Sequence, residues 1–147
     1  MVHRVLHKGS CHCGSVKWQV YADEEISIIE CNCSVCKKKH SRYFIVPLDH
    51  FCITAGHEHL LTYSFNTHTA KHNFCRTCGV QSFFIPRTNP DAVGIMPHCI
   101  DSLTVKKEKI IKFDGMNFDS AVKKNRAMLM KLARKESCVN LKLSNIH

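Results

Sequence analysis

The sequence contains no run of about 18 apolar residues, so none of its segments is expected to span a membrane. Its first residues also lack the apolar stretch and the small-residue cleavage site of a secretory signal. No strand–helix–strand alternation is present, which argues against a doubly wound parallel sheet. Together these absences favour an intracellular protein in a reducing compartment, the cytoplasm or the nucleus.

Acidic residues are also scarce, with 12 Asp or Glu against 21 Lys or Arg and a formal net charge of +9. The excess is concentrated in residues 117–147, which hold seven Lys or Arg against two acidic residues, a local charge of +5. A segment of this charge is either the solvated face of a helix or a surface for an acidic polymer such as nucleic acid.

Cysteine, by contrast, is abundant, with ten among 147 residues. Seven of them form three tight groups: Cys11 and Cys13; Cys31, Cys33 and Cys36; Cys75 and Cys78. Thiolates placed two or three residues apart can converge on one soft cation, and in a reducing compartment they persist as metal thiolates rather than as disulfides. The sequence therefore predicts a zinc protein with two ions per chain.

The first predicted site combines the CxC pair at 11–13 with the CxxC pair at 75–78. Four thiolates complete a tetrahedral zinc site, so this site is expected to be closed and structural. Gly14 and Gly79 follow the two pairs and fit tight turns in which backbone N–H groups approach sulfur. We expect this site to hold the start of the chain against its middle.

The second predicted site is the CxCxxC triplet at 31–36, whose three thiolates leave one coordination position open. Three thiolates favour a soft incoming ligand such as a thiol, which indicates thiol chemistry rather than hydrolysis. Two alternatives remain open. The site could be closed by a fourth ligand, or the triplet could share ligands with Cys75 and Cys78. The candidate fourth ligands are His12, His40, His98 and Cys99.

Short segments rich in β-formers, separated by turn residues, predict a mainly β fold of short antiparallel strands. The expected strands are 16–20, 27–29, 42–46, 51–54, 61–65, 81–85, 93–96 and 109–113. Residues 119–136 are rich in helix formers and predict a C-terminal helix. Its apolar residues at 122, 129, 132 and 133 are expected to dock on the sheet. We therefore divide the chain into a zinc-binding domain at 5–125 and a basic C-terminal helix and tail at 117–147.

Three motifs, CHCG at 11–14, CNCSVC at 31–36 and FCRTCGVQSF at 74–83, resemble those of the glutathione-dependent formaldehyde-activating enzyme family. The centromere protein V branch is the more similar one, and the likeness extends to about residue 125. The resemblance implies an Mss4-like zinc-binding β fold. It also implies that the four-cysteine set is the structural site and the triplet the reactive one.

The reaction that the resemblance implies joins formaldehyde to glutathione and gives S-(hydroxymethyl)glutathione, a reaction classed with the carbon–sulfur lyases. We therefore expect a zinc-dependent carbon–sulfur lyase with glutathione as co-substrate. Lys37, Lys38 and Lys39 are candidates for binding its carboxylates, although they also fit a surface charge run. The candidate proton donors are His98 and His40. The alternative is a non-catalytic zinc module that binds chromatin, microtubules or another partner through its basic tail.

Overall fold

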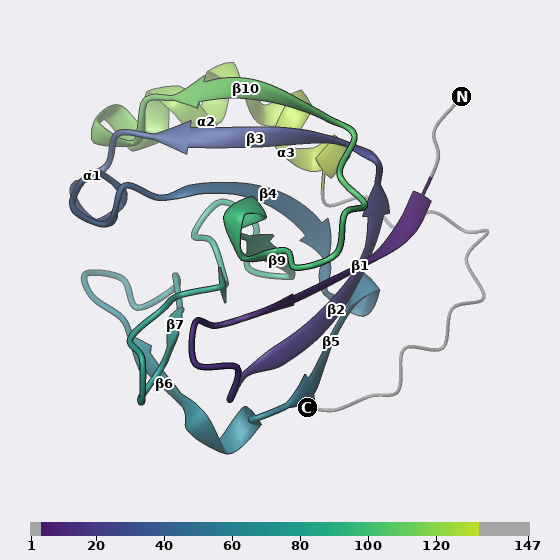
Figure 1. Ribbon diagram of the computed structural model, residues 1–147. Helices are drawn as coiled ribbons and strands as arrows, with labels where there is room; N and C mark the ends of the chain where they lie inside the picture. Colours follow the sequence, from purple (N-terminus) through teal and green to yellow (C-terminus); the bar gives the residue numbers. More distant parts are fainter. Residues whose placement is uncertain (1–3, 133–147) are drawn as a thin grey trace.

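The computed structural model describes residues 4–132, and Figure 1 shows the course of the chain through its strands and helices. The strands are β1 (Arg4–Ser10), β2 (Lys17–Asp23), β3 (Glu25–Cys31), β4 (Arg42–Pro47), β5 (Phe51–Ala55), β6 (Leu60–Tyr63), β7 (His72–Cys75), β8 (Phe83–Phe84), β9 (Ala92–Ile95) and β10 (Lys107–Phe113). The α-helices are α1 (Ser34–Lys39), α2 (Phe118–Lys124) and α3 (Arg126–Leu132), and short 3₁₀ turns are η1 (Leu48–His50), η2 (His57–His59), η3 (Pro97–Cys99) and η4 (Gly115–Asn117). The mainly β fold predicted from the sequence is confirmed.

The strands form three sheets with the orders β1-β2-β5, β10-β3-β4-β9-β8 and β6-β7. In β2, the side chains of Trp18, Val20 and Ala22 are buried and alternate with more exposed neighbours, as the period-two pattern predicts. The indole N–H of Trp18 donates a hydrogen bond to Ser82 Oγ at 2.9 Å. This contact joins the first sheet to the segment that follows the CxxC pair.

The five-stranded sheet departs from the expected antiparallel pattern at one edge. β10 pairs with β3 in parallel, with Phe113 opposite Cys31. A parallel neighbour needs a long connection, and here residues 32–106 supply it. Because of this pairing, the chain leaves β10 beside the cysteine triplet. No helix in the described part of the chain is long and apolar enough to cross a membrane.

The C-terminal helical region is not one continuous helix. After the turn η4, α2 ends at Lys124, and α3 begins at Arg126, with Asn125 between the two helices. The amide of Asn125 donates a hydrogen bond to Ala121 O at 2.8 Å, a local bond that competes with regular helix geometry. The single helix predicted for 119–136 is therefore wrong within the described residues, and 133–147 lie outside them.

The predicted docking of the helical apolar stripe is confirmed for residues 122, 129 and 132, whereas residue 133 lies outside the described part of the chain. Leu129 is buried, and Val122 and Leu132 pack against the core. Asn89 donates a hydrogen bond to Leu129 O at 3.0 Å, which fixes α3 to the loop before β9. Figure 1 shows α2 and α3 behind β10 and β3, where they cover one face of the larger sheet.

Candidate metal centres and their cavity

The four cysteines of the first set converge, although the sequence separates the two pairs by 61 residues. Their Sγ atoms all lie within 4.8 Å of one another. Cys13 Sγ lies 3.6 Å from the sulfurs of both Cys11 and Cys75. Zn–S bonds of about 2.3 Å in a tetrahedron place sulfurs about 3.8 Å apart, so the spacing fits a zinc ion. None of the seven clustered cysteines forms a disulfide within residues 4–132.

Tight turns shape this cluster. Gly14 and Gly79 have φ values of +78° and +75°, a left-handed conformation that favours glycine. The turns aim backbone N–H groups at sulfur, with Val16 N 3.3 Å from Cys11 Sγ and Thr77 N 3.4 Å from Cys75 Sγ. Such donors stabilise metal-bound thiolates, which supports the predicted role of both glycines.

The metal-free thiol of Cys11 is held in its protonated form. Its side chain is 3 % exposed, and burial raises the pKa of its thiol to about 11. Removing such a buried thiol's proton requires a cation close by. The arrangement is therefore suited to a bound metal ion rather than to free thiolates.

The second set, Cys31, Cys33 and Cys36, also forms one cluster, with sulfurs within 4.8 Å of one another. Cys31 ends β3, Cys33 precedes α1, and Cys36 lies on the buried side of α1. Because a strand end and one helical turn bring them together, these ligands converge within six residues. Among residues 4–132, no fourth His, Cys, Asp or Glu joins the group.

The alternatives that the sequence left open can now be decided for the described residues. None of His12, His40, His98 and Cys99 belongs to the triplet's group, and Cys75 and Cys78 belong to the other one. Burial raises the pKa of the Cys99 thiol to about 11, and the charges of Asp101, Cys11 and Cys78 act in the same direction, which places Cys99 near the first cluster. Within the described residues, the triplet therefore offers three protein donors.

The three thiols of the triplet are strongly coupled in the absence of a cation. Hydrogen bonds from Cys31 and Cys36 lower the pKa of Cys33 to about 2. Hydrogen bonds to Cys31 and Cys33, together with burial, raise the pKa of Cys36 far above its usual value. One thiolate is thus stable by itself, whereas a full set of three requires a positive ion among them.

The triplet lies on the wall of a cavity of about 790 Å³. Aromatic side chains form part of the remaining wall, contributed by Tyr43, Phe65, His72, Phe84, Phe113 and Phe118. Cations line it as well: Lys37 and Lys38 from α1, and Arg87, whose guanidinium carbon lies 3.8 Å from the centroid of the Phe118 ring. This volume is within the range of small-molecule sites in proteins and exceeds what a one-carbon aldehyde needs.

The family model for glutathione-dependent formaldehyde-activating enzymes matches residues 6–113. The chain belongs to this family. Both cysteine clusters and most of the cavity wall fall within the matched range. Family membership thus accounts for the motif spacing and for the convergence of the two pairs of the four-cysteine cluster.

The structure described here is similar to the crystal structure of a Rhodobacter sphaeroides protein. The two share 31% sequence identity with a TM-score of 0.59, over 69% of this chain and 98% of the other. The fold expected from the resemblance is therefore confirmed.

The structure separates the three lysines that the sequence grouped together. Lys37 and Lys38 line the cavity, whereas Lys39 does not. Instead, Lys39 Nζ donates a hydrogen bond to Gln81 Oε1 at 2.6 Å and lies 6.0 Å from the centroid of the Phe74 ring. Only two of the three are thus placed to meet a ligand in the cavity.

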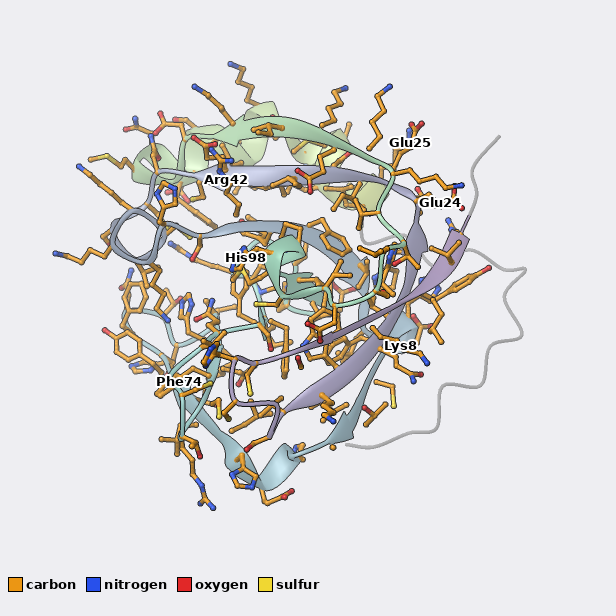
Figure 2. The ribbon with its side chains drawn as sticks, in the orientation of Figure 1. Lys8, Glu24, Glu25, Arg42, Phe74 and His98 are labelled. Atoms are coloured by element: carbon orange, nitrogen blue, oxygen red, sulfur yellow. The ribbon has the colours of Figure 1, made fainter. Side chains whose placement is uncertain are left out.

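His98, the sequence's first candidate for a proton donor, is not among the residues that line the cavity. It is exposed on the turn η3, and Figure 2 shows it near the middle of the view, apart from α1 at the left. The other candidate, His40, is an exposed residue in left-handed conformation at the end of α1. The structure brings neither histidine into the group of three sulfurs.

His72 is the functional candidate that the sequence analysis missed. It lines the cavity and is 3 % exposed, yet neither ring nitrogen has a hydrogen-bond partner among the described residues. An unpaired buried polar group costs about 1–3 kcal/mol, so two such nitrogens require an explanation. With eleven histidines in the chain, no local signal in the sequence distinguishes this one.

Replacement of Gly115 by alanine is expected to weaken metal binding at the triplet at least about tenfold. A Cβ at this position would overlap Cys31 Sγ and lie 2.7 Å from Cys33 Cβ. Competition with a chromogenic zinc chelator measures the effect, and the four-cysteine cluster should keep its ion.

Gly79→Ala is the matched control for this substitution. A Cβ at Gly79 meets no atom within 4 Å, so the strain there comes from the φ of +75° alone. This variant should weaken the first cluster and spare the second. If the chelator removes both ions from Gly115→Ala no faster than from the wild type, the backbone of η4 does not affect metal binding at the triplet.

Proposed function

We propose that this protein is a zinc-dependent carbon–sulfur lyase-like protein that acts on thiol adducts such as S-(hydroxymethyl)glutathione. One observation carries the proposal: a three-thiolate cluster, with no fourth protein donor among residues 4–132, lies on the wall of a cavity large enough for a tripeptide. The four-cysteine cluster has its full number of thiolates and suits a structural ion. Membership of the glutathione-dependent family supports a thiol as the ligand.

The two clusters would each hold one zinc ion, and the ion at the triplet supplies an open position that favours a thiolate. The chain's own residues would bind and orient the rest of glutathione. Lys37, Lys38 and Arg87 present positive charge to its carboxylates. The aromatic walls exclude water from the sulfur and from the carbon attached to it.

Replacing Lys37 and Lys38 together with glutamine is expected to raise the KM for glutathione about 3- to 30-fold with little change in kcat. Each exposed ion pair contributes about 0.2–1 kcal/mol, and the carboxylates are remote from the reacting bond. Steady-state kinetics at low and high salt measure the effect, which should shrink as salt increases.

Lys39→Gln is expected to have the smallest effect of the three lysine substitutions, because Lys39 lies outside the cavity wall. Lys109→Gln, an exposed change on β10, is the control for loss of one positive charge. Unchanged kinetics in the Lys37/Lys38 double variant would remove these residues from the glutathione site.

The experiment that tests the proposed function is a metal count combined with a turnover assay. Purified protein loaded with zinc should contain two equivalents per chain. Glutathione should change the chelator accessibility of one of them and leave the other unchanged. Glutathione-dependent formation or cleavage of S-(hydroxymethyl)glutathione, above the uncatalysed rate, should accompany this response. A glutathione-insensitive pair of ions without turnover would refute the proposal.

The second candidate function is a non-catalytic zinc module that binds an acidic polymer. Lys123, Lys124, Arg126 and Lys131 are exposed on α2 and α3 and favour this reading. Deletion of 117–147 would remove packed residues such as Leu129, so replacement of these four cations together by glutamine is the cleaner test. Salt-sensitive binding to DNA or tubulin that is lost in this variant, without any glutathione response in the full chain, would support this alternative.

A further inference from the structure

The imidazole of His72 is held in place by aromatic rings on the cavity wall. It begins β7 and stacks on Phe84, with ring centroids 5.5 Å apart and ring planes 5° from parallel. Phe65 stacks against it at 5.9 Å and 20°. The ring thus has a fixed orientation that requires no hydrogen bond from the protein.

Its two nitrogens are unpaired, although the ring is almost fully buried. Neither Nδ1 nor Nε2 has a hydrogen-bond partner within residues 4–132. Thr88 repeats the pattern, because its Oγ1 is also buried and unpaired, and it lines the same cavity. Two unpaired polar side chains on the wall of one cavity indicate that a polar ligand supplies their partners.

The charge state of His72 is suited to this role. Burial lowers its pKa, and the nearby Lys39 ammonium acts in the same direction, while Cys33 opposes both. The imidazole is therefore neutral near pH 7, with one nitrogen that donates and one that accepts a hydrogen bond. The interaction with Cys33 also indicates that the ring lies in the electrostatic range of the triplet.

We propose that His72 is a catalytic residue that hydrogen-bonds the hydroxyl group of a thiol adduct in the cavity and accepts its proton when the carbon–sulfur bond breaks. This assignment rests on the proposed function, since it needs a hydroxyl-bearing adduct with its sulfur at the triplet. It differs from the sequence-based choice, because His98 lies outside the cavity wall.

The step balances without a further reactant. In the cleavage direction, the O–H proton of R–S–CH2–OH moves to the free nitrogen of His72. The C–O bond becomes the C=O bond of formaldehyde, and the C–S bond breaks with its electron pair left on sulfur. In the direction of addition, the thiolate attacks the carbonyl carbon and the imidazolium returns the proton to oxygen.

His72→Phe tests the chemical role, because phenylalanine keeps the stacking and removes both nitrogens. We expect turnover by the zinc-loaded protein to fall at least about 100-fold, while the metal content and the affinity for glutathione stay within about twofold of wild type. His57→Phe, an exposed change on η2, is the control and should keep wild-type turnover. Full turnover in a folded His72→Phe variant would overturn the inference.

A second measurement uses the unaltered chain, so it does not depend on whether the variant folds. The ¹⁵N signals of the His72 ring are recorded with glutathione alone and with glutathione plus formaldehyde. We expect them to shift only in the second sample, which contains the hydroxyl-bearing adduct. Equal shifts in both samples, or no shift in either, would contradict a hydrogen bond to the hydroxyl group.

The two proposals fail in different ways. If the wild-type protein turns over with glutathione and His72→Phe does too, the role of His72 is wrong and the proposed function stands. If turnover is absent but the ring signals respond to the adduct, the ligand contact holds and catalysis fails. If the ring signals do not respond and turnover is absent, both proposals fail.

Discussion

Cys75→Ser is expected to abolish cooperative folding and to release both zinc ions. Cys75 is fully buried, and its sulfur lies 3.6 Å from that of Cys13 across 62 positions of sequence. A structural zinc site contributes about 10 kcal/mol or more, whereas a whole domain is stable by about 5–15 kcal/mol. Loss of Cys75 as a metal ligand should therefore remove most of the free energy of unfolding. Circular dichroism during heating and a metal count measure the outcome.

The matched control is Cys52→Ser, because Cys52 is also buried but belongs to neither cluster. This variant should remain folded, retain both ions and lose about 1–3 kcal/mol, as is usual for a buried polar substitution. If Cys75→Ser instead melts as sharply and as late as Cys52→Ser, the four-cysteine cluster does not stabilise the fold.

Cys36→Ser is expected to have the opposite profile, with a folded protein that has lost turnover. The three sulfurs of the triplet come from residues 31–36. An ion bound to them closes no long loop and should add little to global stability. Catalysis by a bound metal is worth several kcal/mol, and each 1.36 kcal/mol is a factor of ten in rate. We expect turnover to fall at least about 10³-fold and the metal count to drop from two to one.

Thermal melting separates the Cys36 variant from the Cys75 variant. Cys36→Ser should unfold cooperatively within a few degrees of wild type, whereas Cys75→Ser should show no such transition. Cys36→Ser protein with both ions and full glutathione-dependent turnover would rule out the open-site mechanism. A Cys36→Ser protein that shows no cooperative unfolding transition would mean that both clusters are structural.

The strands that could be predicted from the sequence bury apolar side chains, whereas the strands that were missed bury mainly other residues. β2 buries Trp18 and Val20, so the alternation is visible in the sequence. β1 buries His7 and Gly9, and β7 buries His72 and Cys75, so neither has an apolar face to detect. α1 has only six residues, too few for a helical period.

The candidate site was predictable where its ligands are close in sequence. Spacing alone indicated that two pairs and a triplet of cysteines are candidate metal ligands, but it left open which of them share a site. The contacts of Gly115 with the triplet could not be predicted, because they depend on the parallel pairing of β10 with β3. The stacking of His72 likewise joins β7 to β8 and to the loop at Phe65. Such contacts are tertiary and leave no local pattern.

The parallel pairing of β10 with β3 also bears on the oxidation of the triplet's cysteines during folding. Parallel pairing across a long connection is slow to form, whereas the triplet's sulfurs meet within one helical turn. Until Gly115 and Phe113 reach them, the thiolates of a newly made or partly unfolded chain are open to peroxides and other electrophiles. We therefore expect peroxide to oxidise the triplet's cysteines faster in newly synthesised chains than in fully folded ones. Zinc present during synthesis should slow this oxidation.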